Sequence, residues 1–105
     1  MIRYHRMKTH VGPFGEVWEG RKVHEFRRDD RDPKYEVGDE VSLIEWNPDA
    51  ERATGREVAV IITYVSRSTM FGLPAGYCVF SFVVSHRSRW ARRYRPPKPP
   101  KVRWS

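Results

Sequence analysis

Cysteine is nearly absent from this sequence, since Cys78 is the single one among 105 residues. A lone cysteine excludes an internal disulfide and a cysteine-based zinc cage, and it favours a reducing compartment. Long hydrophobic runs are also missing: the longest, residues 58–65, is far shorter than the roughly 20 residues of a membrane-spanning helix. The first residues show no apolar signal-peptide core. We therefore expect a cytoplasmic protein that does not enter a membrane.

Acidic residues are missing from the last fifth of the chain. Residues 86–105 carry eight Lys or Arg and no Asp or Glu, whereas residues 1–85 are close to neutral, so the net charge of +7 belongs to the C-terminus. This segment also holds half of the eight prolines, which favour an extended chain. We predict a folded domain over residues 1–85 and a flexible, basic, proline-rich tail over residues 86–105. Within this tail, residues 86–93 could form a short helix.

Three roles fit this tail. It can keep the protein soluble by charge alone. It can also bind nucleic acid without reading its sequence, with arginines on phosphates and rings stacked on bases. The residues for this second role are Arg92, Arg93, Arg95, Trp90, Tyr94 and Trp104. Finally, Arg93, Pro96 and Pro99 fit one orientation of the proline-rich motif that SH3 domains bind, which would make a protein the partner.

Runs of β-branched and aromatic residues predict a mainly β domain with one short helix. The expected strands are residues 6–11, 22–28, 40–46, 56–66 and 77–84, and the expected helix is residues 13–20. Some runs, such as residues 58–62, are apolar on both faces, which suits a sheet whose outer side is covered. The predicted fold class is therefore α+β, mainly β, as a small closed or nearly closed barrel of five to six strands.

The expected helix has clear end signals and one apolar stripe. Pro13 suits the first helical position, and Gly20 suits the left-handed residue just after the last turn. Phe14, Val17 and Trp18 follow the spacing of one helix face, so we expect them to pack against the core.

No pattern of catalytic or metal-ligating residues stands out. Cys78 shares a strand face with Phe80, Phe82 and Val84 by the two-residue period, so we expect a core residue and not a nucleophile. The histidines lack the spacing of metal ligands; they are His5, His10, His24 and His86. No glycine-rich phosphate loop occurs. We expect no metal and no cofactor, and a binding role more than an enzymatic one.

The densest group of charges lies in residues 20–31. On a strand Glu25 and Arg27 face the same way, and the simplest interpretation is a structural ion pair beside solvated charges. The functional alternative is a polar cleft beside the short helix, where Lys22 and Arg27 contact phosphate or a base edge and Glu25 accepts from an exocyclic amine. A desolvated Lys22 or Glu25 could also act there as an acid or base.

Several short motifs in this chain resemble those of a known family. Gly20, Lys22, Glu25 and Arg27 fit the pattern Gly-x-Lys-x-x-Glu-x-Arg, which resembles the signature of ASCH domains, small β-barrels of the PUA-like superfamily. Further matches resemble a group of short ASCH-like proteins of unknown function from bacteria and phages. These are Lys-Thr-His at 8–10, Glu-x-Arg-x-x-Asp-Arg at 25–31, Glu-Trp at 45–46, Thr-Gly-Arg at 54–56 and Phe-Gly-Leu-x-x-Gly-Tyr at 71–77. Val-Gly-Asp at 37–39 follows the ASCH-like signature and belongs with that first resemblance.

The resemblance implies a PUA-like barrel with a cleft beside the first helix. Relatives with this barrel bind RNA or recognise modified bases. One branch of small bacterial ASCH proteins resembles an amidohydrolase of N4-acetylcytidine that uses a lysine, a threonine three residues later and a distant glutamate. Lys22 matches the lysine, but Glu25 stands at the threonine position.

The leading hypothesis is a nucleic-acid-binding module, with RNA as the expected ligand. The residues assigned to binding are Lys8, His10, Lys22, Glu25, Arg27, Arg28, Arg31, Arg92, Arg93 and Arg95. The alternative is a hydrolase of a modified nucleoside, with Lys22 and Glu25 as catalytic residues. The third hypothesis is a phage protein that docks on a host protein through its proline-rich tail, which would place it in the host cytoplasm.

Overall fold

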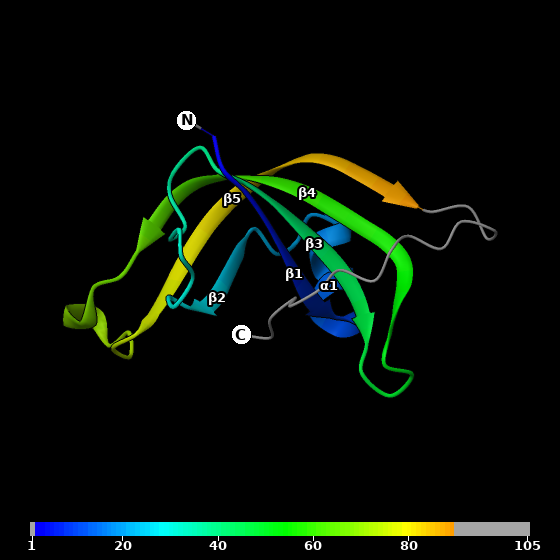
Figure 1. Ribbon diagram of the computed structural model, residues 1–105, viewed down its shortest axis with the longest axis horizontal. Helices are drawn as coiled ribbons and strands as arrows, with labels where there is room; N and C mark the ends of the chain where they lie inside the picture. The colour runs from blue at the N-terminus through cyan, green and yellow to red at the C-terminus, as the bar shows by residue number, and fades with distance from the viewer. Residues whose placement is uncertain (1, 90–105) are drawn as a thin grey trace.

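The computed structural model describes residues 2–89, which form one five-stranded sheet with one short α-helix (Figure 1). In chain order the elements are β1 (Tyr4–His10), α1 (Val11–Trp18), β2 (His24–Arg28), β3 (Glu40–Asn47), β4 (Arg52–Ser66), the 3-10 turn η1 (Thr69–Phe71) and β5 (Tyr77–Arg89). The prediction of a mainly β fold is confirmed, with five strands. Within residues 2–89 no helix is long and apolar enough to cross a membrane.

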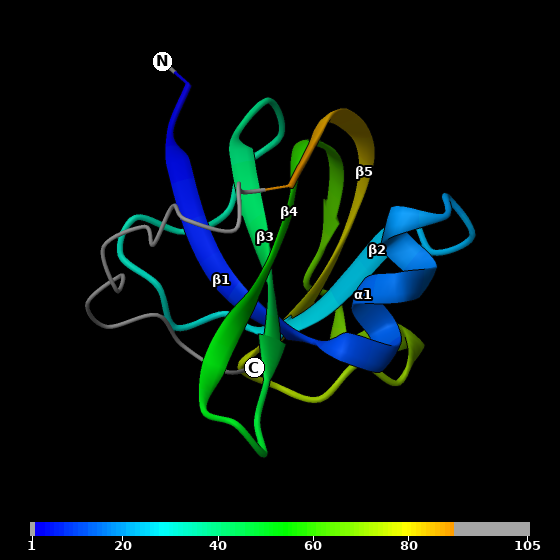
Figure 2. The same cartoon turned by 90° about the vertical axis from the view of Figure 1, so that its right-hand side faces the viewer.

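The sheet runs in the order β1-β3-β4-β5-β2 and curls into half a barrel (Figure 2). β1 pairs with β3 in parallel, and the other neighbouring strands pair antiparallel. The two edge strands, β1 and β2, therefore belong to the first third of the chain. Figure 2 shows them converging at the end of the barrel where β1 passes into α1.

α1 begins at Val11, two residues earlier than predicted, because it follows β1 without a loop. Pro13 is the third helical residue and not the first as predicted, but it still lies in the first turn, where a missing N–H costs no helical hydrogen bond. Gly20 has a φ of 82°, so the predicted left-handed stop is confirmed. The predicted apolar stripe is also confirmed, since Phe14 and Val17 are buried and Trp18 packs against the core.

β4 and β5 form a longer antiparallel ribbon than the sequence predicted. β4 begins at Arg52, and β5 continues to Arg89 with pairing partners on β4 up to its last residue. Because β4 supplies those partners, residues 86–89 are strand, and the helix suggested over residues 86–93 is wrong for them. The predicted boundary at residue 85 therefore falls inside β5. Beyond the described residues lie residues 90–105, among them Arg92, Arg93 and Arg95.

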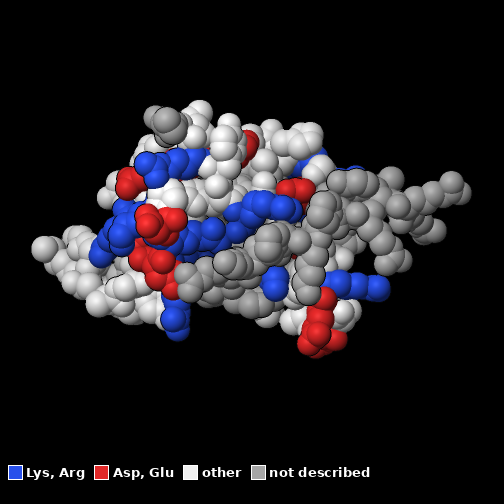
Figure 3. Space-filling view, viewed as in Figure 1, with Lys and Arg blue, Asp and Glu red and all other residues white. Residues whose placement is uncertain are grey.

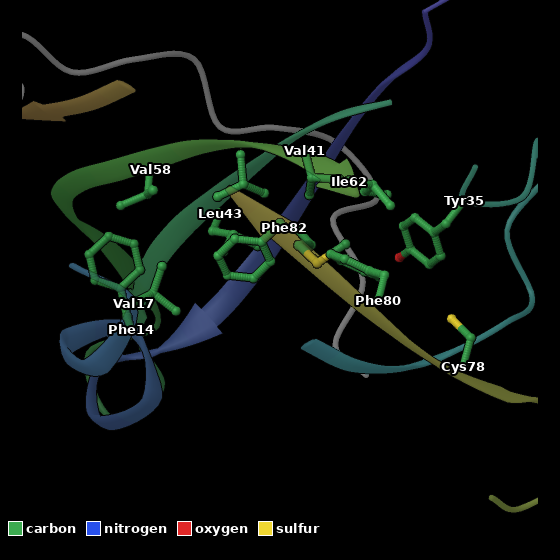
Figure 4. Packing of buried hydrophobic residues seen from close by; sticks show 12 residues of the cluster. Phe14, Val17, Tyr35, Val41, Leu43, Val58, Ile62, Cys78, Phe80 and Phe82 are labelled. Carbon is green, nitrogen blue, oxygen red and sulfur yellow. The ribbon is translucent and has the colours of Figure 1, made fainter. Parts of the chain in front are cut away.

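The hydrophobic core fills the concave side of the sheet (Figure 4). Its members are Met7, Phe14, Val17, Tyr35, Val41, Leu43, Val58, Val60, Ile62, Cys78, Phe80 and Phe82. Cys78, Phe80 and Phe82 enter it from β5, as the two-residue period predicted. Burial is the main cause that raises the pKa of the Cys78 thiol to about 11, so the thiol stays protonated at neutral pH. The prediction of Cys78 as a core residue is confirmed.

A buried carboxylate, Asp39, ties the start of β3 to β1. Its Oδ2 lies 2.9 Å from His5 Nε2 and accepts from the Glu36 amide at 3.0 Å, while Oδ1 accepts from the Arg3 amide at 3.3 Å. Burial alone raises the pKa of Asp39, but the hydrogen bonds from His5 and the two amides outweigh it and hold the pKa below its usual range. The charged form of Asp39 therefore stabilises the fold. Sequence analysis gave His5 no such role.

We predict that Asp39→Asn lowers the free energy of unfolding by about 2–3 kcal/mol at neutral pH, because it removes hydrogen bonds to a charged group. The pKa of Asp39 is lowered in the fold, so its contribution is complete above the unfolded value of about 3.9 and is lost as the pH falls through the folded pKa. Urea unfolding at a series of pH values measures this. The difference from wild type should shrink in acid.

The control for this measurement is Asp49→Asn, which changes an exposed carboxylate in the turn between β3 and β4. It should unfold like wild type at every pH. The free energy of unfolding of Asp39→Asn could instead stay below that of wild type by the same amount down to acidic pH. That result would contradict the stabilising role of the charged carboxylate.

Candidate functional site

Three charged side chains form a connected chain at the start of β2. Lys22 Nζ lies 2.9 Å from Glu25 Oε1, and Arg27 donates to Glu25 Oε2 from Nη2 at 3.0 Å and from Nε at 3.2 Å. Glu25 and Arg27 are only 4% and 5% exposed, whereas the Lys22 side chain is 22% exposed. The structure thus brings these three predicted site residues together, and Lys22 is the member that reaches solvent.

The Arg27 guanidinium also bridges the two edges of the sheet. Its Nη1 donates to the Lys8 carbonyl and its Nη2 to the Thr9 hydroxyl, both at 3.2 Å. In the part of the chain that the structure describes, β1 and β2 share no backbone ladder. The Arg27 side chain therefore supplies hydrogen bonds where a closed barrel would have paired strands. The planar fork of arginine suits this task because it donates in several directions at once.

A second buried carboxylate, Glu45, adjoins this chain, since it is the register partner of Thr9 on the neighbouring strand. It accepts from Arg56 Nε at 2.9 Å, from Arg56 Nη2 at 2.7 Å and from the Thr54 hydroxyl. Burial raises the pKa of Glu45, but Arg56 and Thr54 outweigh it and lower the pKa. Sequence analysis missed this pairing. The sequence does contain a signal for this pairing, because Glu45 and Arg56 carry opposite charges and lie on either side of a hairpin turn.

Trp18 of α1 lies against the ends of β4 and β5. The guanidinium carbons of Arg56 and Arg89 lie 4.7 Å and 5.1 Å from the centre of its ring. Arg87 Nε donates to the Trp18 carbonyl at 2.9 Å. Two of the eight cations assigned to the tail therefore hold α1 against the sheet, and cation–π attraction adds to its packing.

A row of cationic side chains lies on the outer face of β1. Arg6, Lys8 and His10 alternate there with buried residues, and Arg31 Nη2 donates to the Arg6 carbonyl at 2.8 Å. Lys8 Nζ lies 4.0 Å from the centre of the Trp46 ring. Figure 3 shows Lys and Arg gathered in a band across the face that contains β1. We call Arg6, Lys8 and Arg31 the outer band.

The predicted binding residues therefore divide into two sets. The interior set consists of Lys22, Glu25 and Arg27, and the outer set consists of Lys8, His10, Arg28 and Arg31. No group of three His, Cys, Asp or Glu side chains among residues 2–89 is arranged to hold a metal ion. The outer set carries positive charge at the surface, whereas the interior set joins β2 to β1.

Because the Arg27 side chain joins β2 to β1, we predict that Arg27→Ala lowers the free energy of unfolding by about 3–5 kcal/mol. This is the usual effect of breaking a buried ion pair. Arg28→Ala changes the next residue of the same strand, which is exposed, and should unfold close to wild type. Urea unfolding of the two variants beside wild type measures the difference. Equal stability of the two variants would contradict the bridging role of Arg27.

Two comparisons place this chain among known proteins. Residues 4–82 match the family model described as "Domain of unknown function (DUF3850)". The chain is also 42% identical, over 66 residues, to the "Uncharacterized 12.9 kDa protein in GpA 3'region" of Escherichia phage P2. That match covers 63% of this chain and 57% of the phage protein, so it spans less than two thirds of the relative. Since the family model extends from the start of β1 to within β5, the chain belongs to the DUF3850 family.

Proposed function

We propose that this protein is a small nucleic-acid-binding module, with RNA as the expected ligand. The observation that carries the proposal is the outer band, where Arg6, Lys8 and Arg31 place three cationic groups along one edge strand. Such rows attract phosphates whatever the sequence of bases. Residues 90–105 add six Lys or Arg and no acid. We expect their arginines to contact phosphates too, including Arg92, Arg93 and Arg95.

The interior set supports a second contact, to a nucleotide or base beside α1. The Nε, Nη1 and Nη2 atoms of Arg27 donate to Glu25 and to β1, so this guanidinium is bonded to other protein groups. Lys22 is partly exposed and lies next to the Glu25 carboxylate. We therefore expect Lys22 to touch the ligand, while Glu25 and Arg27 hold Lys22 and the β2 backbone in position.

The same residues support a more specific proposal about the fold, that this half-barrel is of the PUA-like, ASCH type. The residues of the ASCH-like signature, Lys22, Glu25 and Arg27, converge in one cluster beside α1. That is the place where the resemblance expects a ligand. A sequence signature whose members meet in space is better support than spacing alone.

We predict that Arg6→Ala combined with Arg31→Ala weakens binding to single-stranded RNA and flattens its salt dependence. Each lost phosphate contact on a single strand reduces the slope of log affinity against log salt by about 0.7, so two contacts reduce it by about 1.4. Fluorescence anisotropy at several salt concentrations measures both effects.

The matched control combines Arg21→Ala with Arg52→Ala, which removes two exposed cations elsewhere and gives the same net charge. Its slope should stay closer to wild type. If both double variants lose the same slope, the outer band is not the site. If wild type binds no RNA at low salt and instead retains a co-purifying protein after nuclease treatment, the docking hypothesis replaces the proposal.

A second candidate function, hydrolysis of a modified nucleoside, is favoured by one observation. The interior network contains the Lys22 amine, the Glu25 carboxylate and the Thr9 hydroxyl. An acyl-transfer enzyme needs its hydroxyl beside a base. The Thr9 hydroxyl accepts from Arg27, whose guanidinium stays protonated and cannot act as that base. The binding role is therefore the better supported of the two.

We accordingly predict no turnover when the purified protein is incubated with a panel of acylated and alkylated nucleosides and the mixture is analysed by liquid chromatography. Turnover that disappears in both Lys22→Ala and Glu25→Gln, with the two variants folded, would establish the hydrolase in place of the binding module.

A further inference from the structure

The outer face of β2, β5 and β4 exposes large apolar side chains that the proposed RNA contacts do not use. Phe26 on β2 is 46% exposed, Tyr64 on β4 is 65% exposed and Val83 on β5 is 55% exposed. The three strands are neighbours in the sheet (Figure 1). The rings on this face therefore need an explanation other than core packing.

Strand register places these side chains on one side of the sheet. Phe26 lies opposite Val79, His24 lies opposite Ser81, and Ser81 lies opposite Tyr64 on β4. Neighbouring strands are about 4.8 Å apart, so Phe26 and Tyr64, two strands apart, are separated by roughly 10 Å across the sheet. That spacing gives two separate positions for flat ligand groups.

A stacked pair of rings and a cation lie at the β2 side of this face. The Phe26 and Tyr77 rings are nearly parallel, with an interplanar angle of 6° and centroids 5.2 Å apart. The guanidinium carbon of Arg28 lies 5.9 Å from the centre of the Tyr77 ring. We call Phe26, Tyr64, Tyr77 and Arg28 the ring face.

The charge on this side of the sheet is complementary to a phosphate chain. The sequence of β5 contains no Asp or Glu, and the one acid of β2, Glu25, is buried on the opposite face. Glu57 of β4 lies far along the ribbon, opposite Ser88. Hydroxyl groups are present, since Thr63 Oγ1 and Ser81 Oγ lie 3.3 Å apart between the strands. Flat rings, hydroxyls and the Arg28 guanidinium suit an acidic ligand that carries flat groups.

We propose that the ring face binds single-stranded nucleic acid, with bases stacked on Phe26 and Tyr64 and a phosphate held by Arg28. Stacking on aromatic side chains tolerates any sequence, because every base has a π-face. The bases must be unstacked to reach the rings, so the face selects single strands over duplexes. This inference rests on the proposed nucleic-acid-binding function and specifies the form of its ligand.

Anisotropy measurements on the full chain test the inference, with a labelled oligouridine of about 12 nucleotides, within the range one small domain covers. Wild type should bind this single strand more tightly than an RNA duplex of equal length. Phe26→Leu and Tyr64→Leu should each weaken single-strand binding about tenfold, because leucine keeps apolar volume but removes the ring on which a base stacks. Phe26→Tyr keeps the ring and should bind like wild type.

Val83→Ala is the matched control, because it removes exposed apolar area from the same face without altering a ring. It should bind like wild type. A loss in Val83→Ala equal to that in Phe26→Leu would overturn base stacking and indicate an apolar docking surface for a protein. Thermal melting checks the fold of each variant, and if Phe26→Leu does not fold, the more exposed Tyr64→Leu decides the question.

The outcomes also separate this inference from the proposed function. Normal binding by both leucine variants, together with weakened binding by the Arg6→Ala and Arg31→Ala double variant, overturns the ring face and leaves the proposed function intact. Absence of RNA binding by wild type at low salt overturns both.

Discussion

The Arg27 guanidinium is the interaction on which this domain depends, because it joins two strands that no described backbone ladder connects. The edges of an open sheet expose backbone groups that need partners. Arg27 reaches from β2 to the Lys8 carbonyl and the Thr9 hydroxyl of β1, and Glu25 balances its charge. A buried charge is tolerated only when it is both paired and hydrogen-bonded. The ion pair therefore has a structural reason to exist whatever the ligand is.

At the end of the barrel beside α1, the buried charged groups form hydrogen bonds within the protein. Inside, Thr9 accepts from Arg27 and lies beside Glu45, its register partner on β3. Trp18 then lies against Arg56 and Arg89. The buried members of this group, Thr9, Glu25, Arg27 and Glu45, bond to other protein groups and so hold the strands in place. The outer band and the ring face, which are proposed to bind nucleic acid, consist of side chains outside this network, and Lys22 is the network member expected to reach the ligand.

Sequence reasoning succeeded where the controlling physics is local. The two-residue period placed Cys78 and Phe80 inside, and glycine's tolerance of a left-handed backbone predicted the helix end at Gly20. It failed where partners are distant in the chain. The pairing of His5 with Asp39 joins residues 34 positions apart, and the Glu45–Arg56 pair depends on the register of a hairpin. No local pattern contains that information, because sheet register is set by the whole set of packed faces.

The sequence by itself determined the mainly β class, the inward face of β5 and the positive charge of the C-terminal segment, since each follows from composition or from spacing of a few residues. It also identified Lys22, Glu25 and Arg27 as a group, while leaving open whether they bind a ligand or support the fold. Only the tertiary structure decided that Arg27 is a bridge and that Lys22 is the member open to solvent. The physical reason is burial, because a side chain's access to solvent depends on strands brought beside it from elsewhere in the chain.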